Sequence, residues 1–273
     1  MRGTIRDRLS RNARTHLVGR EDELGVLQRA LAEGAPVIVH LHGLPGIGKT
    51  ALAAAFAEEV RGSGGTVLAI ECGSVEPTER GLLIELGRLL GCKEQRDAIA
   101  AELEARPLPA LLLFDSYEVF QLLDTWIRQI LLPALPDRVL VLLASCLPPS
   151  EAWTEAPAWQ GLFQTIALGP LSNSAATELL TKLDVPPQDV APIAHFAAGH
   201  PLALTLAARA ARLPPSERGS AEPAEAAVPL LARRYLAGIA DPTTREILRT
   251  ACVARRISHG LLRVLTPDEA TTG

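Results

Sequence analysis

The sequence predicts an α/β fold, in which a parallel sheet is sandwiched by helices and followed by a smaller all-helical unit. Two observations support this prediction. Short, continuously apolar runs alternate with amphipathic stretches from residue 37 to residue 168, and strands that are apolar on both faces are typical of buried parallel sheets. After Leu171 the alternation ends, and only stretches with helical periodicity follow. The 273 residues are 48% hydrophobic, which is enough for a sizeable core.

The apolar runs predict five strands, each bounded by Gly, Pro or a polar residue. The third strand ends at Asp115, which places a carboxylate at the carboxyl edge of the sheet, where open α/β sheets bind ligands. His40 and His42 are two residues apart on the first strand, so their side chains share one face of it. We expect both to be core residues whose hydrogen bonds are satisfied. The predicted strands are 37–42, 66–70, 110–114, 138–145 and 164–168.

Amphipathic and Ala-rich stretches between and after these strands predict helices. Gly91 is the expected stop of one of them, and Ser172 is the expected N-cap of the first helix behind the sheet. A Pro-, Ser- and Glu-containing stretch interrupts the helical part and is interpreted as a linker. The predicted helices are 49–60, 78–90, 95–105, 119–131, 172–183, 188–198, 201–213, 227–239 and 242–253.

Charge and cysteine patterns argue against several classes of protein. The 27 basic and 31 acidic residues give a net charge of −4, which does not suit a surface built to grip nucleic acid. The four cysteines form no C-x-x-C pair, so reduced thiols are expected rather than disulfides or a zinc site. The longest apolar run is far shorter than the roughly 20 residues of a membrane span, so we expect a cytoplasmic protein without a membrane partner. The Arg-rich residues 1–16 are interpreted as a solvated arm, with contact to nucleic acid or a partner as the alternative.

Residues 43–50 read G-L-P-G-I-G-K-T, a full match to the phosphate-binding P-loop pattern G-x-x-x-x-G-K-[ST]. The match follows a predicted strand and opens a predicted helix, as the motif requires. Its glycines let backbone N–H groups face phosphate oxygens, and the helix N-terminus adds partial positive charge. We expect Lys49 to reach the β- and γ-phosphates and Thr50 to ligate Mg²⁺. The predicted contacts to ATP or ADP in this loop are Gly43, Leu44, Pro45, Gly46, Ile47, Gly48, Lys49 and Thr50.

Two acidic residues follow the third predicted strand. Asp115 is expected to hold Mg²⁺ together with Thr50, and a helix N-cap is the alternative. The residue after Asp115 is Ser116 rather than Glu, so Glu118 is the candidate that polarises the attacking water, with Lys49 as the second catalytic residue. For Glu118 the alternative is only a favourable charge at a helix N-terminus.

Other segments, in the same order along the chain, resemble the STAND ATPases, an AAA+-related class in the ASCE branch of P-loop ATPases. Residues 17–24, L-V-G-R-E-D-E-L, are similar to the V-G-R-E-x-E-L signature of that class. The segment D-S-Y-E at 115–118 and the later Trp126-x-Arg128 resemble the Walker B region of its bacterial members. Gly199-His200-Pro201 is similar to their G-x-P motif, with a plain interhelical turn as the alternative.

The resemblance implies further contacts and a domain organisation. In these families the V-G-R-E segment packs against adenine and the G-x-P proline closes over the nucleotide, which implies that Val18, Gly19, Arg20 and Pro201 bind it. A winged-helix module usually follows and needs more chain than remains here, so a truncated member is expected. Contact with nucleic acid is then expected only through the missing C-terminal regions. The implied parts are a basic arm (1–16), a P-loop α/β core (17–170), a helical lid (171–213), a linker (214–226) and a partial winged-helix region (227–273).

The function implied by the resemblance is a signal-transduction switch with slow Mg²⁺-dependent hydrolysis, read out by protein partners or by self-association. The alternative is an ATP- or ADP-binding interaction module that does not hydrolyse. Cys146 favours the alternative, because bacterial members have an Arg at this position and a neutral thiol cannot stabilise charge on the γ-phosphate. A small-molecule phosphotransferase ranks last, since residues 150–161 carry no Arg or Lys for a lid.

Overall fold

The computed structural model describes residues 17–212. The expected basic arm, the linker and the helices at 227–239 and 242–253 lie outside the described residues.

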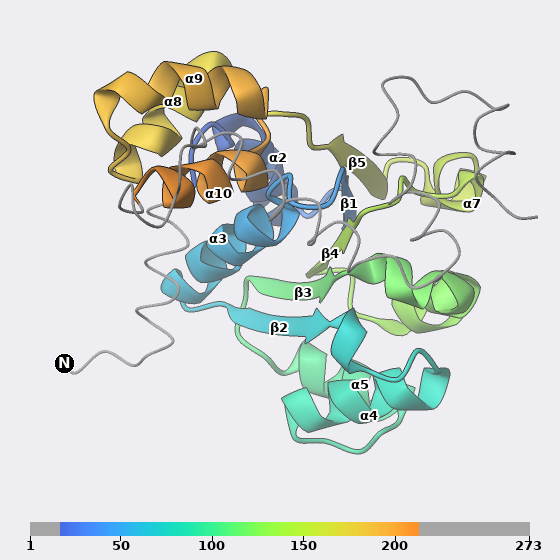
Figure 1. The fold of residues 1–273 in the computed structure, drawn as a ribbon. Coiled ribbons are helices and arrows are strands. Elements are labelled where there is room, and N and C mark those ends of the chain that lie inside the picture. The colour runs from blue at the N-terminus through green and yellow to red at the C-terminus, as the bar shows by residue number, and fades with distance from the viewer. Residues whose placement is uncertain (1–16, 213–273) are drawn as a thin grey trace, which may run out of the picture.

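Five parallel strands form one sheet in the order β2-β3-β4-β1-β5 (Figure 1). The five predicted strands are confirmed, and no end is shifted by more than one residue. Because β4 lies between β1 and β3, the loop after β1 and the carboxylate after β3 meet at the same edge but are separated by the end of β4. The strands are β1 (Ile38–His42), β2 (Thr66–Glu71), β3 (Ala110–Asp115), β4 (Val139–Ser145) and β5 (Phe163–Ala167).

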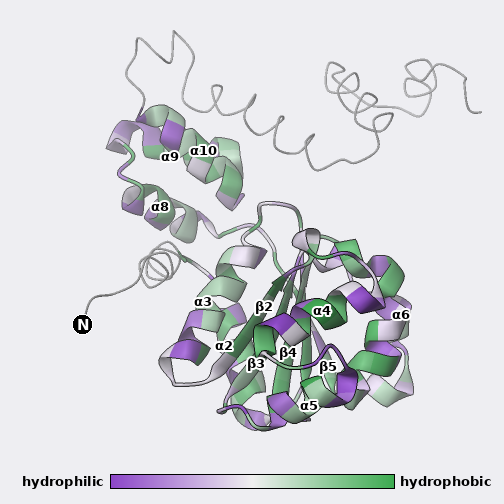
Figure 2. Cartoon of the chain, turned by 90° about the horizontal axis from the view of Figure 1, so that it is seen from below, coloured by the Kyte–Doolittle hydropathy of each residue, from purple (hydrophilic) through white to green (hydrophobic). Residues whose placement is uncertain are grey.

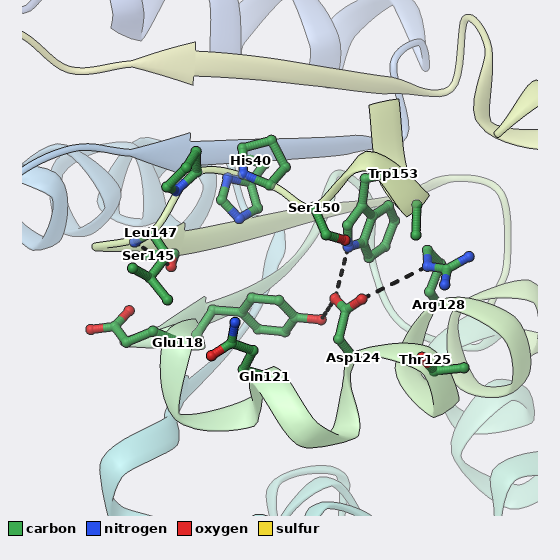
Figure 3. Close-up of a pocket in the computed structure, with 14 residues that line it drawn as sticks. His40, Glu118, Gln121, Asp124, Thr125, Arg128, Ser145, Leu147, Ser150 and Trp153 are labelled. Carbon is green, nitrogen blue, oxygen red and sulfur yellow. Dashed lines mark hydrogen bonds and ion pairs between the residues drawn. The ribbon is translucent and has the colours of Figure 1, made fainter. Parts of the chain in front are cut away.

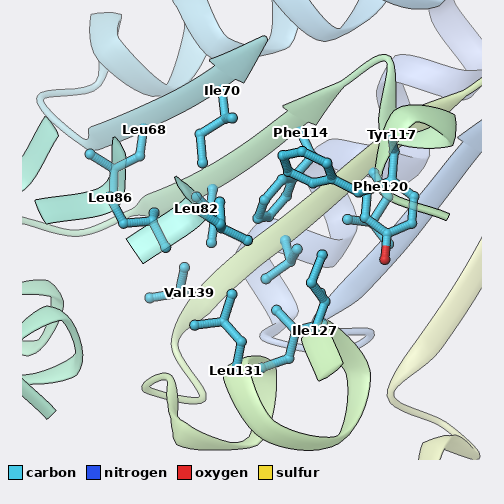
Figure 4. Close-up of a cluster of buried hydrophobic side chains, with 14 of the residues drawn as sticks. Leu68, Ile70, Leu82, Leu86, Phe114, Tyr117, Phe120, Ile127, Leu131 and Val139 are labelled. Atoms are coloured by element: carbon cyan, nitrogen blue, oxygen red, sulfur yellow. The ribbon is translucent and has the colours of Figure 1, made fainter. Parts of the chain in front are cut away.

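Helices cover both faces of this sheet (Figure 2), and β3 and β4 are apolar along almost their whole length, whereas the edge strand β5 carries exposed Gln164 and Thr165. Alternate residues of β1 point to opposite faces: Val39 and Leu41 join the core beneath α2 and α3, whereas Ile38 joins the core on the other side. That second core gathers Phe114, Phe120 and neighbouring leucines (Figure 4). The helices are α2 (Glu21–Glu33) and α3 (Lys49–Gly62) on one face, with α4 (Glu79–Leu90) and α5 (Arg96–Glu104) on the other.

The prediction of one regular helix at 119–131 is wrong, because the chain changes its helical type twice within these residues and once more after Leu131. Phe120 leaves helical geometry at φ −93° and ψ 15°, and its ring is fully buried in the core. The next residues are held from the side, since the Asp124 carboxylate accepts a hydrogen bond from Tyr117. Pro133 then supplies no N–H. The pieces are the 3₁₀ helix η2 (Tyr117–Leu123), α6 (Asp124–Trp126), the π-helix η3 (Ile127–Leu131) and the 3₁₀ turn η4 (Leu132–Ala134).

Three further helices stand apart from the sheet as a helical unit (Figures 1 and 2). They are α8 (Asn173–Lys182), α9 (Pro187–Ala197) and α10 (Pro201–Ala211), close to their predicted positions. Ser172 is the N-cap of α8 as expected, because its hydroxyl accepts a hydrogen bond from Ala175 N at 3.2 Å. The helices bury their own apolar cluster, which also contains Val18 from the chain before α2. None of the helices within 17–212 has the length and hydropathy needed to cross a membrane.

His40 departs from the expected satisfied core residue. It is 2% exposed, as predicted, but its Nδ1 atom has no hydrogen-bond partner among the described residues. Burial, aided by His42, lowers the pKa of His40 from 6.5 to about 4, so the ring is neutral at pH 7.

This buried ring predicts an acid-sensitive fold. Between pH 6.5 and pH 4 the unfolded chain binds a proton at His40 that the folded chain does not, so the free energy of unfolding falls as the pH falls. A shift of one pKa unit corresponds to about 1.4 kcal/mol, so we expect His40→Gln to remove up to about 3 kcal/mol of this loss of stability. Urea unfolding of the wild-type protein and of His40→Gln, each at pH 7 and at pH 4, measures the loss. Equal losses in the two proteins would show that His40 is not the group responsible.

Candidate functional site

The glycines of the loop between β1 and α3 adopt conformations and contacts that other residues cannot. Gly43, Gly46 and Gly48 have φ values of 155°, 77° and 105°. A Cβ at Gly43 would lie 2.7 Å from Leu168 O, and one at Gly46 would lie 2.7 Å from Leu202 Cδ2. The loop is therefore packed tightly between the segment after β5 and the start of α10, and its conformation is fixed by the fold.

Lys49 opens α3 and is 8% exposed. Its Nζ atom donates to Gly43 O at 2.8 Å and to Leu44 O at 3.1 Å, and lies 3.2 Å from Cys146 Sγ at the end of β4. The ammonium group is thus held at the centre of the loop. Carbonyl oxygens are weaker partners than anions, so phosphate oxygens would exchange favourably for these contacts.

A cavity of about 750 Å³ opens at this edge of the sheet. Its walls come from the loop, from the ends of β3 and β4, and from the first turns of α10. The structure therefore brings together residues from four separate stretches of sequence. Among its lining residues are Gly48, Lys49, Thr50, Asp115, Glu118 and Pro201, all of which the sequence marks as candidates.

Asp115 and Thr50 lie side by side in the cavity. Burial raises the pKa of Asp115, and a hydrogen bond from the Thr50 hydroxyl partly offsets that rise. The carboxylate also accepts from Ser116 N at 3.0 Å, but no side chain caps the start of η2, which leaves the helix-cap alternative without support. Within residues 17–212 no group of three or more His, Cys, Asp or Glu could hold a metal. A hydroxyl and a single carboxylate instead suit Mg²⁺, which completes its shell with waters and phosphate oxygens.

Glu118 reaches the same cavity from η2. Its Oε2 atom accepts a hydrogen bond from Cys146 N at 2.9 Å, which anchors the carboxylate to the end of β4. Cys146 itself lines the cavity, and burial raises the pKa of its thiol, so it is uncharged at pH 7. Position 146 is therefore next to the expected phosphate site, where a charged residue would act directly.

The V-G-R segment braces the site from outside. Arg20 is 5% exposed and donates to Ile47 O at 3.0 Å and to Gly169 O at 2.6 Å. A Cβ at Gly19 would lie 2.4 Å from Ala175 Cβ, and Val18 is buried in the core of the helical unit. None of the three lines the cavity of about 750 Å³, so a direct contact with adenine stays a prediction.

Sequence reasoning missed two contacts between α10 and the loop. Leu202 N donates to Gly46 O at 3.2 Å, and His200 Nε2 lies 3.2 Å from Pro45 O. His200 Nδ1 also accepts from Ala203 N at 3.4 Å, which makes this histidine the N-cap of α10 and requires Nε2 to carry the proton. The sequence signal that could have revealed this N-cap is His200, a side chain able to form hydrogen bonds, directly before Pro201 at a predicted helix start.

Comparisons with known proteins bear on the fold. No curated protein matches the sequence. Three similar solved structures share 17% identity with the chain, which shows the fold alone. They are the Orc1 protein of Aeropyrum pernix in complex with DNA (TM-score 0.56, 91% of this chain and 76% of that chain), Cdc6p from Pyrobaculum aerophilum (0.56, 90% and 78%) and the RuvB Holliday junction branch migration motor of Thermotoga maritima (0.50, 90% and 81%).

The fold is that of AAA+ P-loop NTPases, a parallel sheet flanked by helices, and the P-loop sequence lies directly after its first strand. More specifically, residues 16–144 match the family model of the AAA ATPase domain. Membership of the STAND class and a bacterial type remain predictions.

Proposed function

We propose that the chain binds ATP or ADP with Mg²⁺ and acts as a nucleotide-dependent switch in signal transduction, with slow hydrolysis. The observation that carries this proposal is the direct contact between the helical unit and the loop. Because Leu202 N bonds to Gly46 O, a change in the loop on binding phosphate acts directly on α10. The γ-phosphate would favour one arrangement of the helical unit, and its loss another.

Each residue of the cavity has a part in this proposal. Lys49 pairs with the β- and γ-phosphates, and Thr50 and Asp115 hold Mg²⁺, which supplies charge neutralisation when bound. Glu118 orients the attacking water and accepts its proton, and Cys146 N keeps that carboxylate in place. Pro201 begins α10 at the cavity wall and would close over the nucleotide. Partners or further copies of the chain would read the position of the helical unit.

The second candidate is a nucleotide-binding interaction module without hydrolysis. The uncharged Cys146 thiol beside Lys49 Nζ favours it, since no other positive charge lines the cavity among the described residues. An assay of ATP hydrolysis with the purified protein distinguishes the two candidate functions. Mg²⁺-dependent ADP release that disappears in Asp115→Ala supports the switch, whereas intact ATP binding without any release supports the module.

Replacing Cys146 with Arg is expected to speed hydrolysis. The guanidinium would stand near the γ-phosphate and stabilise the charge that develops there, as an Arg at that position does in the resembling class. We expect a rise of about 10-fold in single-turnover ADP formation, from roughly 1.4 kcal/mol of added stabilisation. Cys146→Lys adds a positive charge without the planar guanidinium of Arg, and Cys146→Ser is the neutral control. An unchanged or slower rate in Cys146→Arg would place position 146 away from the γ-phosphate.

A further inference from the structure

A second cavity, of about 290 Å³, lies beside the nucleotide site on the face of the sheet opposite α3 (Figure 3). Its walls come from β1, from the irregular segment η2–α6–η3, from the loop that follows β4 and from the short helix α7 (Glu151–Thr154), which carries Trp153. The volume falls near the lower end of the range of small-molecule sites, about 300 to 1,000 Å³. Glu118 lines both cavities, so the two are neighbours.

The walls of this second cavity are fixed by one carboxylate. Asp124 Oδ1 accepts hydrogen bonds from Tyr117 Oη at 2.8 Å and from Trp153 Nε1 at 2.7 Å. These bonds join α7 to the η2–α6 segment. Trp153 is in turn stacked on Phe163 of β5, with ring centroids 5.1 Å apart. The cavity is therefore preformed.

Polar groups around the cavity lack partners. His40 Nδ1 and Arg128 Nε are buried and form no hydrogen bond within 17–212. Arg128 Nε lies 3.8 Å from Asp124 Oδ2, too far for a hydrogen bond. Gln121 and Thr125 also line the cavity, but both are exposed to solvent. Leaving a buried polar atom unpaired costs about 1–3 kcal/mol, so two such side chains on the walls of one cavity, His40 and Arg128, indicate a binding site.

The charges and shapes of the walls select the ligand. Arg128 stands at one end, with its Cζ atom 5.9 Å from the centre of the Trp153 ring (Figure 3). Glu118 stands at the opposite end and is already held by Cys146 N. The rest of the lining includes Tyr117, the neutral His40 ring and two prolines, together with the Asp124 carboxylate and polar side chains. The Arg128 guanidinium forms only a long ion pair with Asp124, at 3.8 Å, and donates no hydrogen bond to a described residue, so its N–H groups suit a planar carboxylate. Aromatic and proline rings in the walls suit a flat apolar body.

We infer that this second cavity binds a small aromatic carboxylate, whose acid group pairs with Arg128 and whose ring lies against Tyr117, Pro148 and Pro149. A consequence at the nucleotide site follows from the loop after β4, and this step rests on the proposed function. Cys146 N holds Glu118 in the nucleotide cavity, and the residues directly after Cys146 line the second cavity. Occupation of the second cavity would therefore shift Glu118 and change ATP turnover.

The probes are benzoate and indole-3-carboxylate, with benzamide and indole-3-carboxamide as uncharged partners of the same shape. We expect the full chain to bind at least one carboxylate in isothermal titration, with the matching amide at least 10-fold weaker, since about 1.4 kcal/mol corresponds to 10-fold. Arg128→Gln should lose this preference. Ala152→Leu should fill the cavity and weaken acid and amide alike, and it keeps the test informative if Arg128→Gln does not fold. Lys182→Gln, on α8, is the control: it removes a positive charge from another part of the chain, and carboxylate binding should be unchanged.

Several outcomes would overturn the inference: no carboxylate binding to the wild-type chain at millimolar concentration, equal binding of acid and amide, or binding that Ala152→Leu leaves unchanged. Lys49→Ala separates this inference from the proposed function. In that variant carboxylate binding should persist while nucleotide binding is lost, so the second cavity stands even if the switch does not. Conversely, nucleotide binding with no carboxylate binding would remove the second cavity alone.

Discussion

Lys49→Ala is expected to weaken ATP binding by at least 100-fold. Lys49 is the one basic residue lining the cavity of about 750 Å³ in the described part of the chain, and its ammonium group is almost fully buried. Hydrogen bonds to charged groups contribute about 1.5–3 kcal/mol each, so loss of two phosphate contacts corresponds to about 3–6 kcal/mol. Titration with a fluorescent ATP analogue in the presence of Mg²⁺ measures the change.

The design of this experiment separates binding from folding. The truncation leaves the carbonyl oxygens of Gly43 and Leu44 without the ammonium group, a small loss beside the whole core. We therefore expect the melting temperature without nucleotide to change by only a few degrees. Lys49→Arg keeps the charge but changes its shape, and should bind with intermediate affinity. Wild-type affinity in Lys49→Ala would refute the P-loop as the nucleotide site.

Gly46→Ala is expected to detach α10 from the loop and to weaken nucleotide binding by 10-fold or more. The new Cβ would lie 2.7 Å from Leu202 Cδ2 and 2.8 Å from Leu202 Cβ, and the backbone has φ 77°. Left-handed geometry costs a non-glycine residue about 1–2 kcal/mol, and the clash must be relieved by moving the helix. That movement breaks the bond from Leu202 N to Gly46 O.

Amide hydrogen exchange of the start of α10 measures this detachment, and Gly48→Ala is the matched control. Gly48 also has positive φ, 105°, but a Cβ there would meet nothing within 4 Å. The control therefore carries backbone strain without the clash, and α10 should keep its protection. If Gly46→Ala leaves exchange in α10 unchanged, the contact between the helical unit and the loop does not transmit anything, and the proposed switch loses its main support.

The loop and the strands could be predicted because their signals are local. G-x-x-x-x-G-K-[ST] fixes a turn, a helix start and a cation within eight residues, and each strand is a single apolar run. Asp115 was predicted for the same reason, because it follows its strand directly. The coordinates place it beside Thr50, as the spacing alone could not.

What the sequence did not reveal depends on partners far along the chain. Arg20 donates to Gly169 O, a residue 149 positions away, and no periodicity marks such a pair. The irregular course of 117–134 follows from Phe120 entering the core and from Asp124 accepting a hydrogen bond from Trp153 of α7. Local propensity favoured a regular helix there, and packing overrode it. The unpaired Nδ1 of His40 likewise depends on what surrounds β1.

In the described part of the chain one stretch of backbone joins the helical unit to the sheet. It leaves β5, where Leu168 N donates to His42 O, and reaches α8 past Leu171. Arg20 donates to Gly169 O in this connection and to Ile47 O in the P-loop. A single guanidinium therefore couples the course of the connection to the course of the loop, so a shift in one is passed to the other.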